Sequence, residues 1–168
     1  MVNKSHSKIA DLDNYDLAIL EILQQDNIFP QREIADKVNL SAAAVNRRIK
    51  RMTDNGVIKS NIAVIDPDKV GQFITIIVNV EFLNEQIELI DEAKRKFSSF
   101  PQVQQCYYVT GEIDFILVIN VPTMANYEAL TRQLFFNDSN IKRFRTFVAM
   151  DRVKVGLAIP VNGNSILK

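Results

Sequence analysis

Hydrophobic residues in the first third of the chain recur every three or four positions, which is the spacing of one face of a helix. A first helix is predicted to begin near Leu12, where Asp13 is placed to cap the first turn and Asp16 lies three residues further on. A second helix is predicted to begin near Phe29 and Pro30, because proline is tolerated in a first turn. The first third is therefore predicted to be helical.

The second predicted helix ends in a short corner. Asn39 tolerates the left-handed conformation that ends a helix, and Ser41 is a good N-cap for the helix that follows. The two helices are thus joined by only about 3 to 4 residues. A corner of this length is typical of a helix-turn-helix.

The third predicted helix, residues 41–55, has one apolar face and one polar face. Val45, Ile49 and Met52 recur at helical spacing and are expected to face the other two helices. Each residue advances the helix by about 100°, which directs another set outward or onto the flanks: Ala43, Ala44, Asn46, Arg47, Lys50 and Arg51.

A different pattern begins at Phe73, where apolar and polar residues alternate as in a strand. The predicted elements are a strand, a helix, two strands joined through Gly111, a helix that opens at Pro122, and a last strand: 73–82, 86–100, 103–110, 113–121, from 122, and 144–155. This order predicts a ferredoxin-like βαββαβ arrangement, with an antiparallel sheet that carries both helices on one face.

The two patterns predict an α+β protein of two domains. Residues 1–60 are expected to form the helix-turn-helix domain, and residues 73–168 the ferredoxin-like domain. Residues 61–72 are expected to link them, with a short extended stretch over 61–65 before a turn at Asp66 to Asp68.

The second face of the predicted sheet has no helix to cover it. The strand over residues 113–121 is nevertheless apolar on both sides, because Ile116 and Val118 alternate with Phe115, Leu117 and Ile119. An apolar uncovered face is expected to pack against a partner. We therefore predict a homodimer formed through the sheets.

The balance of charge narrows the possible partners. Twenty basic residues balance twenty acidic ones, so nucleic acid can be held only by a local basic patch. Residues 41–60 contain five basic residues and one acidic residue, a net charge of +4. Together with the short corner and the apolar spacing, this concentration favours binding of double-stranded DNA over a face that is merely solvated or that contacts another protein.

Within this basic segment, Arg47 and Asn46 are the best candidates to read base edges, since arginine pairs with guanine and asparagine with adenine. Phosphates are expected to be held by Ser41, Lys50, Arg51 and Lys59. Arg48 lies nearer the buried edge, where it either pairs within the protein or reaches a phosphate.

The residues that enzymes and metal sites require are scarce. The chain has one histidine, His6, and one cysteine, Cys106, and its sequence has no catalytic triad, metal-ligand cluster or phosphate-binding glycine loop. No stretch is apolar for long enough to span a bilayer or to act as a signal peptide. We expect a cytoplasmic protein with no metal, no cofactor, no catalytic residue and no membrane partner.

The chain resembles the leucine-responsive regulatory protein and asparagine synthetase regulator (Lrp/AsnC) family of transcription factors over almost its whole length. The resemblance is carried by fragments in a specific order and spacing: Leu12-Asp13 with Asp16 and Ile19-Leu20, Leu40-Ser41 with Val45, Arg48-Ile49 and Gly56-Val57-Ile58, Asp66-Pro67 with Val70-Gly71, residues 109–115, Val121-Pro122 with Met124 and Tyr127, and residues 145–148.

The resemblance implies a winged helix-turn-helix followed by an AsnC-type effector domain, with dimers formed through the sheets and often octamers. In the family, small molecules, usually amino acids, bind between dimers near a loop that corresponds to Gly111 to Asp114 here. From the residues alone this loop is more simply interpreted as a hairpin turn. Carried over from the family, the candidate effector contacts are Thr110, Gly111, Glu112, Asp114, Thr146, Phe147 and Val148.

We accordingly predict a sequence-specific DNA-binding transcriptional regulator that is associated with the nucleoid and responds to an amino acid or a related metabolite. Two alternatives remain open. One is a metabolite sensor that does not bind DNA. The other is an enzyme that resembles sirohaem decarboxylases, which have this same layout but use pocket histidines; the single His6 argues against it.

Overall fold

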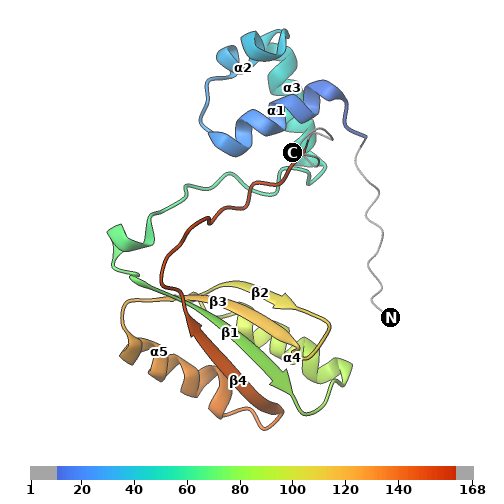
Figure 1. The fold of residues 1–168 in the computed structure, drawn as a ribbon. Helices are drawn as coiled ribbons and strands as arrows, with labels where there is room; N and C mark the ends of the chain where they lie inside the picture. Colours follow the sequence, from blue (N-terminus) through green and yellow to red (C-terminus); the bar gives the residue numbers. More distant parts are fainter. Residues whose placement is uncertain (1–10, 162–168) are drawn as a thin grey trace. The chain divides into compact units, whose positions relative to one another are not determined.

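The computed structural model describes residues 11–161 (Figure 1), so His6 lies outside the described part. The chain divides into two compact units. The first unit, called the DNA-binding unit after the predicted helix-turn-helix domain, comprises residues 11–63 and 155–161 of the described chain. The second, called the effector unit after the predicted effector domain, comprises Val64 to Lys154. The segment after Val155 was expected in the second domain, and its contacts instead group it with the first.

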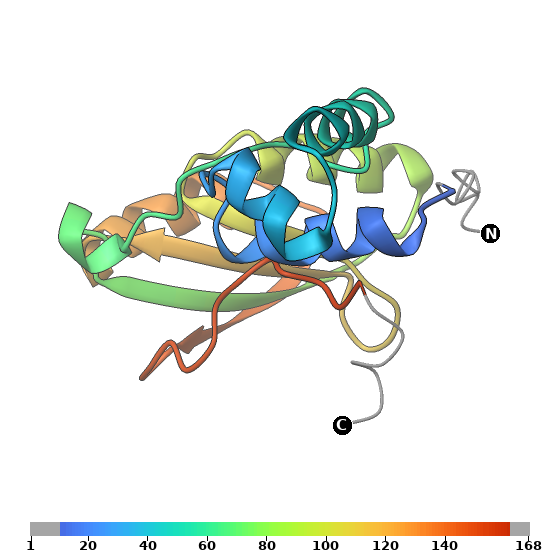
Figure 2. The ribbon, with the colours of Figure 1, turned by 90° about the horizontal axis from the view of Figure 1, so that it is seen from above.

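In the described residues, the DNA-binding unit contains the helices α1 (Asn14–Gln25), α2 (Gln31–Val38) and α3 (Ala42–Asp54), labelled in Figure 1 and drawn from blue to teal in Figure 2. The predicted cap of α1 is confirmed, because the Asp13 side chain accepts from the Asp16 N–H and the Asp16 side chain accepts from the Asp13 N–H. The apolar faces of the helices meet in a core whose most buried members are Ile19, Ile34, Val45 and Met52.

The corner between α2 and α3 has the predicted length and chemistry. Asn39 ends α2 in the left-handed conformation, with φ 54° and ψ 45°. Ser41 then caps α3, because its Oγ accepts from the Ala44 N–H at 3.2 Å. These three connecting residues, 39–41, fix the direction in which α3 leaves the corner.

The C-terminal segment is anchored to α1. The side-chain amide of Gln24 donates to the Ile159 carbonyl at 3.0 Å and accepts from the Ile159 N–H at 2.7 Å. Val161 packs against the core of the three helices. The segment 155–161 is therefore held against the three helices by hydrogen bonds between the Gln24 side chain and the Ile159 backbone and by apolar contact.

The effector unit has a four-stranded antiparallel sheet in the order β2-β3-β1-β4. Its elements, in chain order, are the 3₁₀ helix η1 (Pro67–Val70), β1 (Ile74–Phe82), α4 (Ile87–Ser98), β2 (Val103–Tyr108), β3 (Phe115–Val121), α5 (Met124–Thr131), the π-helical turn η2 (Arg132–Phe136) and β4 (Ile141–Val148). This is the predicted ferredoxin-like arrangement.

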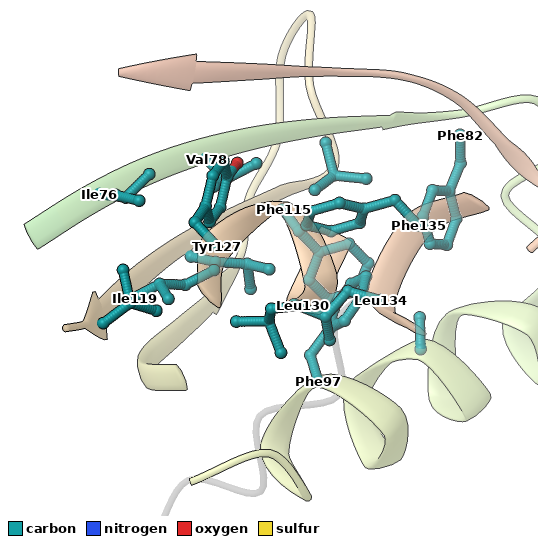
Figure 3. Packing of buried hydrophobic residues seen from close by; sticks show 14 of the residues in the cluster. Ile76, Val78, Phe82, Phe97, Phe115, Ile119, Tyr127, Leu130, Leu134 and Phe135 are labelled. Atoms are coloured by element: carbon teal, nitrogen blue, oxygen red, sulfur yellow. The ribbon is translucent and has the colours of Figure 1, made fainter. Parts of the chain in front are cut away.

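One face of the sheet is buried beneath both helices. Along β1 the buried side chains are those of alternate residues from Ile76 to Phe82, as the alternation predicted. Figure 3 shows these residues packed against aromatic side chains from α4 and α5–η2. The Phe97 ring lies 5.3 Å from the Phe115 ring and 6.1 Å from the Phe135 ring, so it joins α4 to β3 and η2.

The last predicted strand is wrong at both ends, because it covers Ile141–Val148 instead of residues 144–155. A strand needs a neighbouring backbone to accept and donate hydrogen bonds. The pairing of β4 with β1 ends at Val148, and only one further bond, from the Ala149 N–H to the Thr75 carbonyl, follows it in the described chain. Residues 61–65, expected to be an extended stretch, form no strand.

The position of Phe97 predicts a large loss of stability on truncation. Phe97→Ala should lower the free energy of unfolding of the effector unit by about 3–5 kcal/mol, because it removes a fully buried ring and leaves a cavity. Leu83→Ala, at an exposed position, should change it by less than about 0.5 kcal/mol. Urea unfolding followed by circular dichroism measures both, and equal effects would contradict this account of the core.

Candidate nucleic-acid interface and effector loop

The outward face of α3 presents the predicted base readers. The side chains of Ala43, Asn46, Arg47 and Lys50 are exposed, whereas Val45 and Met52 on the opposite face are fully buried. Ala44 is half-buried on the flank, and Gln31 donates to the Asn46 Oδ1 at 3.4 Å. The outward face of α3 therefore carries one short row of exposed polar side chains, those of Asn46, Arg47 and Lys50.

Arg48, which the sequence left open between two roles, pairs within the protein. Its Nη1 donates to both carboxylate oxygens of Asp13, at 2.9 and 2.8 Å, and to Asp16 Oδ1 at 2.8 Å. The guanidinium also lies over the Tyr15 ring, 5.4 Å from its centroid. Arg48 thus fastens the middle of α3 to the first turn of α1.

Asp16 is the buried centre of this cluster, with a fully buried side chain. Besides Arg48, it accepts a hydrogen bond from Arg51, so two cations of α3 converge on one carboxylate. The Asp16 N–H and the Arg48 guanidinium hold the pKa of Asp13 below its usual value, since both stabilise the ionised form. We define Asp13, Asp16, Arg48 and Arg51 as the Asp16 cluster.

The Asp16 cluster divides the basic residues of the segment into two kinds. Arg48 and Arg51 are paired inside the unit, and Arg51 remains about half exposed. Arg47, Lys50 and Lys59 are exposed and form no ion pair within residues 11–161. The positive charge that is available to an external anion is therefore concentrated on these three side chains.

The glycine loop between β2 and β3 is tied down by Asp114. The Asp114 Oδ2 accepts from the Phe82 N–H at 2.7 Å, its N–H donates to the Val80 carbonyl, and its carbonyl accepts from Val109. Asp114 is only 8% exposed. This candidate effector contact therefore also satisfies the backbone at the end of β1.

The other loop residues are open to solvent. Thr110, Gly111 and Glu112 are exposed, and Gly111 has a φ of 128°, a conformation that side chains rarely adopt. The backbone and side-chain groups of these three residues are accessible to a small ligand. The hydrogen bonds of Asp114 hold the end of the loop against β1.

A single chain does not bring Thr146, Phe147 and Val148 to this loop. Phe115, at the end of the loop, pairs with Val80 of β1, and Val80 pairs with Phe144 of β4. Thr146 to Val148 come after Phe144 and run away from the loop along β4. They are also two strand spacings away, about 10 Å. The seven candidate effector residues therefore form two separate groups within one chain.

The β4 group also points to two sides of the sheet. Thr146 shares a hydrogen bond of 2.6 Å with the Tyr127 hydroxyl on the helix side, and burial raises the pKa of Tyr127. Phe147 pairs with Ile77 on the opposite, helix-free face. The spacing of residues along the chain did not predict the contact between Tyr127 and Thr146, because it depends on how α5 lies against β4.

Two other features are absent from residues 11–161, a membrane-spanning helix and a metal-ligand group. No helix in that range is long and apolar enough to cross a membrane. That range also contains no group of three histidine, cysteine or acidic residues placed to hold a metal ion.

Two family models match the chain, and together they cover most of it. A winged helix-turn-helix DNA-binding model matches residues 12–59, and an Lrp/AsnC ligand binding domain model matches residues 75–159.

Similar proteins agree with these models. The chain is 40% identical to an uncharacterized HTH-type transcriptional regulator of Sinorhizobium fredii, over 90% of this chain and 89% of that protein. An AsnC family transcriptional regulator from Agrobacterium tumefaciens superposes with a TM-score of 0.84 at 31% identity, covering 89% and 97% of the two chains. A Neisseria meningitidis transcriptional regulator in complex with L-methionine superposes with a TM-score of 0.83 at 21% identity, covering 90% and 97%.

The Asp16 cluster predicts that Arg48 supports the stability of the DNA-binding unit, whereas the adjacent Arg47 supports binding to DNA. Arg48→Ala should destabilise the DNA-binding unit by about 2 kcal/mol or more, because it leaves the buried Asp16 with one cation fewer. Arg47→Ala should leave stability within about 0.5 kcal/mol of the wild type, since its side chain is exposed.

Urea unfolding measured on the full chain compares the two variants, and retention on DNA is measured on the same samples. Arg47→Ala should reduce retention while it leaves the unfolding midpoint unchanged. Equal destabilisation by both substitutions would contradict the division of α3 into a paired and a free set of cations.

Proposed function

The chain belongs to the Lrp/AsnC family of DNA-binding transcriptional regulators, and from this premise we propose which of its surfaces read DNA, sense a metabolite and join copies of the chain. The family membership confirms the prediction of a regulator and excludes the enzyme alternative, because the matched models and the named relatives are those of transcriptional regulators. We propose that it acts on double-stranded DNA in the cytoplasm, in association with the nucleoid.

The recognition surface is the outward face of α3. The observation that carries this proposal is that Arg47 and Lys50 stay exposed and form no ion pair with any described residue, while their neighbours Arg48 and Arg51 are held by Asp16. Arg47, with Asn46, reads base edges in the major groove. Lys50 and Lys59 hold phosphates, with the exposed flank of Arg51 and the Ser41 end of the helix beside them.

The ligand surface is the loop from Thr110 to Asp114. Its accessible backbone at Gly111 and its carboxylates at Glu112 and Asp114 suit a molecule with both a carboxylate and an ammonium group, such as an amino acid. The L-methionine complex of the Neisseria meningitidis regulator supports this ligand class. Thr146, Phe147 and Val148 complete the site only if they come from another copy of the chain, as between dimers of an octamer.

The homodimer forms through the helix-free face of the sheet. Ile77, Tyr107 and Phe147 are exposed on this face, and Ile116 and Val118 are half-buried between them. A face that carries five large apolar side chains on four strands is costly to leave in water. A second copy buries it with the same residues on both sides of a twofold interface.

Capture of sheared source-genome DNA tests the regulator and its ligand together. The wild-type chain near physiological salt should enrich a few promoter fragments, and a pooled amino-acid mixture should change that enrichment. The double variant Arg47→Ala, Lys50→Ala should lose the enrichment. The control Arg95→Ala, Arg132→Ala removes two exposed positive charges from the effector unit and should keep it.

The outcomes separate the parts of the proposal. Retention that is unchanged in the Arg47 and Lys50 variant would contradict the recognition surface. Enrichment that no amino acid alters would contradict the ligand class while it leaves DNA recognition standing. Absence of enrichment in the wild type would favour the sensor that does not bind DNA.

The dimer interface has its own test. Val118→Lys should reduce the mass in solution toward that of one chain, 19.1 kDa, because it places a charge at the centre of the buried face. Ile87→Lys, at an exposed position of α4, should leave the mass unchanged. Light scattering coupled to gel filtration measures both, and an unchanged mass for a folded Val118→Lys would contradict this interface.

A further inference from the structure

Arg152 lies in the segment that follows β4, and its guanidinium donates hydrogen bonds to four acceptors. Nε donates to Thr75 Oγ1 at 2.7 Å, and Nη1 donates to Asp68 Oδ1 at 3.0 Å. Nη2 donates to the carbonyls of Gln72 and Phe73, each at 3.1 Å. The side chain is only 20% exposed, so these four contacts replace most of its hydration.

All four acceptors belong to one short stretch of chain, residues 68–75. This stretch contains most of η1 and the start of β1, where the chain enters the effector unit after Val64. Arg152 itself stands three residues before Val155, where the chain leaves the effector unit and returns to the DNA-binding unit. The Arg152 side chain therefore links the two connections between the units, the one by which the chain enters the effector unit and the one by which it leaves.

The surrounding contacts join this tie to the sheet. Ala149 donates its N–H to the Thr75 carbonyl at 2.9 Å, which extends the pairing of β4 with β1 by one hydrogen bond. The Thr75 hydroxyl, which accepts from Arg152, donates to Asn120 Oδ1 on β3 at 2.9 Å. Arg152 is thus linked through Thr75 to β3, the strand that the glycine loop precedes.

The guanidinium of Arg152 is suited to hold the two connections in a fixed geometry. Each contact of Arg152 is charge-assisted, and the planar guanidinium fixes the directions of its donors, which a lysine cannot reproduce. Without it, residues 68–73 and 149–154 would be joined mainly through the sheet contacts that flank them. Each connection would then move more independently of the other.

We propose that Arg152 is a positioning residue that holds the two interunit connections together, so that a change in the effector unit reaches the DNA-binding unit through both connections at once. The regulatory part of this inference rests on the proposed function, because it requires an effector response. Arg152 contacts neither the recognition face of α3 nor the loop from Thr110 to Asp114.

Spin labels measure the positioning directly, without any ligand. Cysteines placed at the exposed positions Asp36 of α2 and Glu92 of α4, in a Cys106→Ser chain, are labelled and diluted with excess unlabelled chain. Pulsed electron resonance then gives the distance distribution between the two units. Arg152→Ala should widen this distribution, and Arg132→Ala, which removes an exposed arginine of an i,i+4 pair, should not.

Arg152→Lys serves as a second variant if Arg152→Ala does not fold. It keeps the charge but cannot reach all four acceptors, so its distribution should be wider than that of the wild type and no wider than that of a folded Arg152→Ala. A distribution that matches the wild type in the folded variants would overturn the proposal.

The functional measurement uses the retained promoter fragment and the pooled amino acids. In Arg152→Ala, the fold-change in retention caused by the mixture should fall toward one, while retention without the mixture persists. A full response in a variant with a widened distribution would overturn the regulatory role. If the wild type itself shows no response, the proposed ligand class fails, and the spin-label comparison still decides whether Arg152 positions the units.

Discussion

Asp16 is a carboxylate without access to water, and such a group is stable only when cations and hydrogen-bond donors surround it. Arg48 and Arg51, one turn apart on α3, supply those cations, and Asp13 completes the pairing of Arg48. This arrangement fixes the rotation of α3 about its own axis. Since Arg48 is drawn toward α1, Arg47 and Lys50 are left facing outward, and the surface for DNA follows from a contact inside the unit.

The periodicity of the sequence predicted the helices and the order of the strands because each element buries a continuous apolar face. Asp13, Asn39 and Ser41 were placed correctly, since capping and left-handed corners depend on neighbours within a few residues. The last strand was predicted to continue to Val155, whereas β4 ends at Val148. Where a strand ends depends on which backbone lies beside it, and local spacing does not contain that information.

The candidate sites were predictable to different degrees. Spacing around α3 was sufficient to separate an inward from an outward face, but it could not assign Arg48, whose partners lie more than 30 residues earlier in the chain. The acidic loop was found through family resemblance. The tie from Asp114 to the Phe82 N–H, and the division of the effector residues between the loop and β4, depend on strand register across the sheet.

The central claim is that cations on the free face of α3 bind DNA phosphates, and the dependence of affinity on salt tests it most directly. For a fragment retained from the genome, a dimer that neutralises about 6 to 10 phosphates should lose roughly 10³ to 10⁵ in affinity between about 50 and 200 mM salt. Lys50→Ala should make that dependence shallower, by roughly one unit of slope for each phosphate contact removed. A flat dependence in the wild type, or an equal slope in Lys50→Ala, would contradict the account.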